Sequence, residues 1–183
     1  MRTLSIALGL SLAISASPSA ASVLVIQKSL AATCYESAAG KRHDWTAIQD
    51  CSSALDHEMM TRDDRAATLV NRGMLRMRSG KIDSATRDFD RALELAPTEP
   101  EVWLAKSISE FDAGNSAAAL QLSDKAISLR TRRPAVAYYI RGLAKEINGD
   151  VEGAYADLVR ARDLDPAWSD PAMQLTRYKV IRR

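Results

Sequence analysis

The sequence is poor in the residues on which most enzyme chemistry depends. It has two histidines and two cysteines among 183 residues, and aromatic residues make up only 5%. The chain contains no glycine-rich phosphate loop, no HExxH pair of metal-binding histidines and no GxSxG nucleophile elbow. We therefore expect no catalytic site, no bound metal and no cofactor, and we predict a protein that is not an enzyme.

An excess of charge of one sign is also missing. The chain has 25 lysines and arginines against 23 aspartates and glutamates. This near-balance gives no basic field that would attract nucleic acid or anionic lipid, so we expect neither as a partner. Beyond the N-terminus, no apolar run approaches the roughly 20 residues that a helix needs to cross a bilayer. We predict that the mature chain does not span a membrane.

The first 21 residues have the pattern of a secretory signal peptide. Arg2 supplies the positive start, and residues 4–16 form an apolar stretch of about 13 residues, too short to span a bilayer. Ser19 and Ala21 are the small residues typical of a cleavage site, so we predict cleavage after Ala21. An uncleaved anchor helix is the alternative. Since no cysteine stands at that junction, we expect a periplasmic or secreted protein without a lipid anchor.

A block of about 34 residues recurs through the rest of the chain. The residues that repeat at intervals of 34 and 35 are Gly80, Gly114 and Gly149, Ala85, Ala119 and Ala154, and Ala92, Ala126 and Ala161. Small residues at a period of this length indicate paired antiparallel helices that stack into an α-solenoid. We therefore predict an all-α fold of helix-turn-helix repeats.

The period divides the chain into six segments. Residues 1–21 are the predicted signal peptide, residues 22–65 an N-terminal segment with a degenerate first repeat, and residues 169–183 a C-terminal capping helix. The three full repeats are predicted at residues 66–99, 100–134 and 135–168.

The repeats resemble those of tetratricopeptide repeat proteins, which place a large apolar residue, a glycine, an alanine, an aromatic residue, an alanine and a proline at fixed positions. The first full repeat matches at Leu69, Gly73, Ala85, Phe89, Ala92 and Pro97. The third matches at Tyr138, Gly142, Ala154, Leu158, Ala161 and Pro166. The second keeps Trp103, Ala119 and Ala126 and departs at Ser107, Ser123 and Thr131. The resemblance implies a non-enzymatic adaptor that docks a peptide or protein segment on the concave face of the solenoid.

In this family the first helix of each repeat lines the concave face. The resemblance maps that face onto Val70, Asn71, Met74, Met77, Leu104, Ile108, Phe111, Tyr139, Ile140 and Leu143. A mostly apolar groove with flexible methionines suits a helical or extended peptide. The alternative is that these residues pack against neighbouring helices or a second copy, which would make the protein a self-associating or structural subunit of an envelope complex. A carboxylate clamp is not expected, because Asn71 alone fits one.

The same alignment predicts two structural ion pairs. Arg72 stands before the repeat glycine and Asp88 before the aromatic position, and Arg141 and Asp157 hold these positions in the third full repeat. Antiparallel helices bring the two positions together. We therefore expect the pairs Arg72–Asp88 and Arg141–Asp157.

The two cysteines are Cys34 and Cys51. An even number of cysteines in an exported protein favours a disulfide, and two buried free thiols are the alternative. The resemblance places both cysteines in facing positions of the degenerate first repeat, which implies that they pair.

Overall fold

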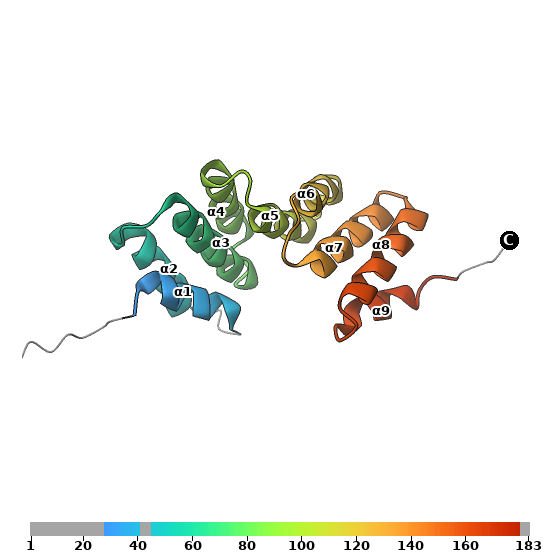
Figure 1. The fold of residues 1–183 in the computed structure, drawn as a ribbon, viewed down its shortest axis with the longest axis horizontal. Coiled ribbons are helices and arrows are strands. Elements are labelled where there is room, and N and C mark those ends of the chain that lie inside the picture. The colour runs from blue at the N-terminus through green and yellow to red at the C-terminus, as the bar shows by residue number, and fades with distance from the viewer. Residues whose placement is uncertain (1–27, 41–44, 180–183) are drawn as a thin grey trace, which may run out of the picture.

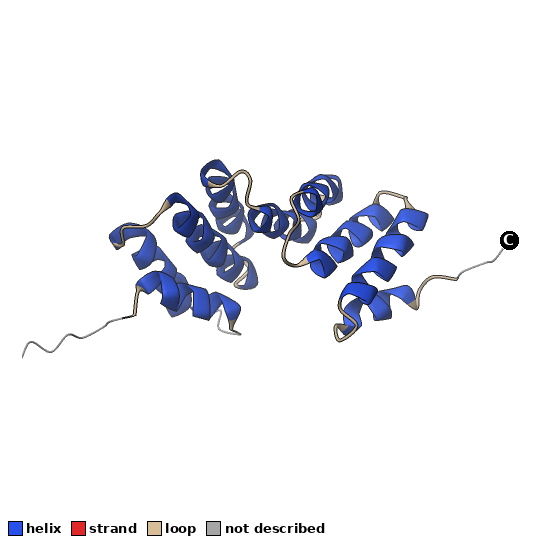
Figure 2. Ribbon diagram, viewed as in Figure 1, coloured by secondary structure: helices blue, strands red, loops and turns tan. Residues whose placement is uncertain are grey.

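The computed structural model describes residues 28–40 and 45–179, so the predicted signal peptide and its cleavage site lie outside the described residues. Within this part, every regular element is a helix (Figure 2). The helices are α1 (Leu30–Ala39), α2 (Trp45–His57), α3 (Arg62–Arg78), α4 (Ile82–Leu95), α5 (Pro100–Asp112), α6 (Ser116–Ser128), α7 (Pro134–Ile147), α8 (Val151–Leu164) and α9 (Ser169–Leu175). The prediction of an all-α fold is confirmed.

Four helix pairs and a final helix stack into an arch (Figure 1). Each pair packs on the next through α2 and α3, α4 and α5, α6 and α7, and α8 and α9. The first helices α3, α5 and α7 also contact one another in sequence, and they run along the inner side of the arch, whereas α4, α6 and α8 form its outer side. This arrangement is the α-solenoid that the period predicts.

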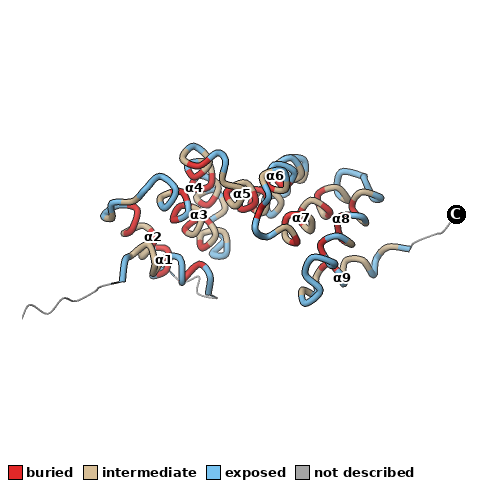
Figure 3. The backbone as a smooth tube through the Cα atoms, viewed as in Figure 1, coloured by how far each residue is buried: buried red, intermediate tan, exposed pale blue. Residues whose placement is uncertain are grey.

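The repeated glycines and alanines have separate physical roles. Gly80, Gly114 and Gly149 end the first helices at φ of 73°, 84° and 88°, a left-handed conformation that glycine adopts without a steric penalty. The repeated alanines are fully buried between helices, where a small side chain allows close approach. Figure 3 shows the buried parts of the backbone along the faces where neighbouring helices meet.

Two helix ends differ from the predicted boundaries. Helix α3 begins at Arg62, four residues before the predicted start of the repeat, because the Thr61 hydroxyl caps it by accepting from the N–H of Asp64 at 3.1 Å. Helix α9 ends at Leu175 and covers only part of the predicted 169–183 cap. Tight backbone turns, including the Tyr178 N–H to the Leu175 carbonyl, follow it.

The predicted arginine–aspartate positions do lie opposite each other. The Arg72 guanidinium donates twice to the Asp88 carboxylate, at 3.0 and 2.8 Å, and Arg76 donates to it at 2.6 Å. Arg141 donates twice to Asp157, at 2.7 Å in both bonds. Both carboxylates are buried. These pairs join the two helices of the first and third full repeats.

The cation in this position also reaches back to the preceding repeat. Arg72 donates to the Ser52 hydroxyl on α2 at 3.2 Å, and Arg141 donates to Asp124 on α6 at 2.6 Å. In the second full repeat Lys106 holds the same position and pairs with Asp90 on α4. Sequence reasoning found the pairs within repeats and missed this second set, which fixes the register between repeats.

The two cysteines lie side by side where α1 meets α2. Their Sγ atoms are 2.09 Å apart, and both residues are completely buried. They pack in a small apolar cluster with Ala47, Ile48 and Leu75, the last of which comes from α3. This apolar cluster therefore joins the first helix pair, α1 and α2, to α3.

Candidate docking surface

The first helices α3, α5 and α7 line the concave face of the arch (Figure 1). Residues four apart on a helix share a face, so each helix contributes its final residue and the residue one turn earlier. We call this set the concave row: Met74 and Arg78 on α3, Ile108 and Asp112 on α5, and Leu143 and Ile147 on α7. The earlier member on each helix is apolar and half-buried.

Most of the predicted groove residues reach the surface, and two do not. The half-buried ones are Val70, Asn71, Met74, Met77, Ile108, Phe111, Tyr139 and Leu143. Leu104 is 0% exposed and packs with Ala126 and Ala137, so its place in the groove is wrong. Ile140 is only 7% exposed and belongs with the core. Leu104 is covered because α6 and α7 lie directly against it.

Tyr139 is partly covered by the last residue of its own predicted repeat, at the junction with α9. Its ring lies against Trp168, with ring centroids 4.7 Å apart, at the start of α9. Burial raises the pKa of the Tyr139 phenol, as expected for a group that the protein shields from water. Helix α9 therefore closes the far end of the predicted groove.

Val70 and the groove methionines Met74 and Met77 contact the core on one side and solvent on the other. Val70, Met74 and Met77 pack on their inner side against the buried cluster of Ala85, Phe89 and Ala105. Their other side remains partly exposed. Both hypotheses from the sequence thus apply to the same side chains, which pack between repeats and also form an apolar floor.

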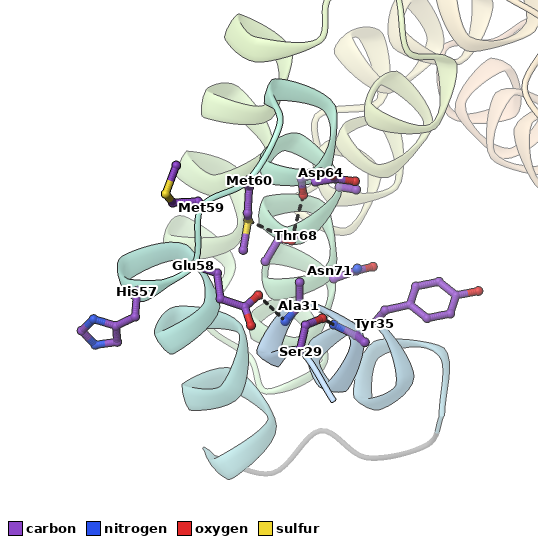
Figure 4. Close-up of a pocket in the computed structure, with 12 residues that line it drawn as sticks. Ser29, Ala31, Tyr35, His57, Glu58, Met59, Met60, Asp64, Thr68 and Asn71 are labelled. Atoms are coloured by element: carbon purple, nitrogen blue, oxygen red, sulfur yellow. Dashed lines mark hydrogen bonds between the residues drawn. The ribbon is translucent and has the colours of Figure 1, made fainter. Parts of the chain in front are cut away.

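A cleft of about 750 Å³ opens at the N-terminal end of the arch, beside the start of α3 (Figure 4). It lies between α1, the segment that joins α2 to α3, and the start of α3, and Asn71 is one of its lining residues. Glu58 holds one wall in place, since its carboxylate accepts from the N–H groups of Leu30 and Ala31 at 2.5 and 3.0 Å. Tyr35, at 63% exposed, stands on its rim.

A second cleft of about 470 Å³ lies at the C-terminal end of the concave face. Its lining residues are Phe111, Leu143, Glu146, Ile147, Gln174 and Arg177. Arg177 of the segment after α9 forms an ion pair with Glu146 of α7, and Ile147 is 65% exposed. Of these six, the repeat alignment names Phe111 and Leu143 as groove residues. Gln174 and Arg177 lie outside the repeats and carry no periodic signal.

The described residues contain no cluster of three side chains that could hold a metal ion. Across the same ranges, none of the helices combines the length and the apolar character needed to cross a bilayer.

The profile of the tetratricopeptide repeat family matches residues 66–99. The chain is 30% identical over 100 residues to the CTR9 homolog of Arabidopsis thaliana; the match covers 55% of this chain and 9% of that protein. The chain thus spans about a tenth of that relative.

Two solved structures share the fold. The first TPR of Spaghetti (RPAP3), solved with the HSP90 peptide SRMEEVD, is 23% identical with a TM-score of 0.59, over 63% of this chain and 90% of that one. MamA from Desulfovibrio magneticus RS-1 is 21% identical with a TM-score of 0.64, over 78% and 77% of the two chains. At these identities the likeness is one of fold.

Proposed function

Because this chain is a tetratricopeptide repeat protein, built on a scaffold that typically binds protein or peptide partners without catalysis, we propose that it is an adaptor in the cell envelope. It docks a peptide or protein segment on the concave face. The observation that carries the proposal is the half-exposed apolar row of Met74, Ile108 and Leu143, with one cleft beside Leu143 and another beside the start of α3. Apolar surface in a concave, preformed site is typical of peptide recognition.

Export supports the envelope location. The pattern of residues 1–21 predicts a cleaved signal peptide, and a cysteine pair suits an oxidising compartment. Cell fractionation followed by N-terminal sequencing checks this part. A mature protein that begins at Ser22 in the periplasmic or secreted fraction agrees with it, and an intact N-terminus in the cytoplasm contradicts it.

Site-specific photo-crosslinking tests the docking face. A photoreactive phenylalanine derivative replaces Ile147, which lies on the concave row and is 65% exposed. The control places the same derivative at Trp45, which is 66% exposed at the start of α2. Since the two positions are equally accessible, adducts at position 147 alone support the concave face.

The mass of the adduct separates the proposal from self-association. A crosslink to a different protein supports the adaptor function, whereas an adduct of twice the chain's mass would favour a self-assembling subunit. Equal yields of the same adducts at both positions would refute the concave face as the site. Replacement of Met74 and Ile108 by aspartate should abolish the adduct while circular dichroism shows that the variant stays helical.

A further inference from the structure

The charges of the concave row are uneven. Arg78, Asp112 and Ile147 are the last residues of α3, α5 and α7, so they occupy equivalent places along the arch. Arg78 is already engaged, since its guanidinium donates to the Ala38 carbonyl at 2.7 Å at the end of α1. Arg78, the cation of the concave row, is thus already bound to the protein's own backbone.

Asp112 differs because its carboxylate has no ion pair or hydrogen bond within the described residues. It shares a helix face with Ile108, one turn earlier. Burial raises the pKa of its carboxyl, with no cation opposing that effect. An unpaired carboxylate of this kind is stabilised by a cation brought next to it.

Phe111, the residue before Asp112 in the chain, lines the C-terminal cleft. Phe111 lines it together with Leu143 and the exposed Ile147, so its walls are largely apolar. Its one cation, Arg177, is paired with Glu146. The cleft and Asp112 together therefore carry one unbalanced negative charge.

We propose that the C-terminal half of the concave face binds a segment with a bulky apolar side chain next to a lysine or arginine. The apolar side chain enters the cleft beside Phe111 and Ile147, and the cation pairs with Asp112. An acidic segment would add a second negative charge beside an unpaired carboxylate, so the same surface selects against it. This proposal rests on the docking function and specifies the chemistry of the partner.

A library of random dodecapeptides displayed on phage tests the charge preference without a known ligand. The full mature protein is compared with its Asp112→Arg variant. A matched control is Asp56→Arg, because Asp56 is also an exposed acid in the last turn of a helix, α2, and lies outside the concave row. We expect the wild type and the control to enrich lysine or arginine next to aliphatic or aromatic residues, and Asp112→Arg to lose or reverse that charge bias.

Affinity measurements on the most enriched peptide complete the test. Isothermal titration should show about fivefold weaker binding to Asp112→Asn, as for a partly exposed ion pair. Ile147→Ser, a change at an exposed position, should also weaken binding by about fivefold, through lost apolar contact.

The outcomes separate this proposal from the function on which it rests. Peptides without charge bias that still lose affinity for Ile147→Ser would overturn the basic-partner proposal and leave concave docking standing. Enriched acidic peptides would overturn it in the same way. A library that yields no binding peptide also overturns it, and the docking function is then judged by the crosslink at position 147. Selection of a peptide that matches this chain's own sequence would replace the partner with a second copy.

Discussion

The close contact between Gly73 and Phe89 gives the sharpest quantitative prediction. A methyl group on residue 73 would lie 2.5 Å from Cε1 and 2.8 Å from Cζ of the Phe89 ring, whereas carbon atoms in contact sit about 3.5–4.0 Å apart. The ring would have to move by about 1 Å. It is completely buried against Ala85 and Ala105, so it has no free space to enter.

The Gly73→Ala variant therefore combines two opposite effects. Overpacking of a core costs about 1–3 kcal/mol, and the upper end applies to a buried ring held on both sides. Alanine in place of glycine within a helix stabilises by about 1 kcal/mol. We expect a net loss of about 2 kcal/mol in the free energy of unfolding, measured by urea denaturation of the mature protein and followed by circular dichroism.

A second substitution isolates the ring as the cause. In the third full repeat Leu158 faces Gly142, and a methyl group there would lie 3.2 Å from Leu158 Cγ, a much milder contact. In a Phe89→Leu background, Gly73→Ala should therefore cost less than about 0.5 kcal/mol, a coupling of more than about 1 kcal/mol. Stabilisation by Gly73→Ala in the wild type, or an equal cost in both backgrounds, would refute the reasoning.

Three further predictions concern polar groups and the cysteines. Asp88→Ala leaves two arginines without their buried partner and should lower the free energy of unfolding by about 3–5 kcal/mol, measured by urea denaturation. Asp90→Ala breaks a more exposed pair and should lower it by under about 1 kcal/mol. Similar losses in the two variants would contradict this. If Cys34 and Cys51 form a disulfide, a reducing agent should lower the free energy of unfolding by about 3 kcal/mol in the wild type and leave the double alanine variant unchanged. Burial by itself would raise the pKa of Glu101, but hydrogen bonds from the Thr131 hydroxyl and a backbone N–H lower it below the ordinary 4.5. Ionised Glu101 therefore stabilises the fold above about pH 4.5, and this stabilisation is lost as the pH falls through the lowered pKa. Glu101→Gln should make the free energy of unfolding depend less on pH in the acid range. An unchanged pH dependence would contradict this.

The features that the sequence predicts well are those that one repeat determines by itself. The spacing of Gly80, Gly114 and Gly149 predicts the turns because a left-handed φ must recur wherever the same turn recurs. The Arg72–Asp88 pair follows for a similar reason, since both positions belong to one antiparallel helix pair. Contacts of this kind depend on the internal geometry of a repeat, and the period reports that geometry directly.

The features that the sequence misses depend on what lies beyond a repeat. The N-terminal cleft is bounded by Tyr35 and Glu58, from a first helix pair whose alignment is degenerate. The C-terminal cleft needs Arg177, from a segment outside the repeats. No periodic signal marks these residues, because each serves an end of the stack that occurs once. The charge at the concave face was missed for another reason: Asp112 is conspicuous only once its lack of a partner is known.

One position of the predicted groove also joins each repeat to the next. Val70, Leu104 and Tyr139 stand at equivalent positions, and in each case the next first helix covers them: Val70 packs near Ala105 of α5, Leu104 against Ala137 of α7, and Tyr139 against Trp168 at the start of α9. This position therefore joins one repeat to the next. One turn further along, Met74, Ile108 and Leu143 are half-buried, and the helix ends at Arg78, Asp112 and Ile147 are exposed. A partner should contact the ends of the first helices, so substitutions at the earlier position should lower stability, and those at the exposed helix ends should lower binding while the fold remains intact.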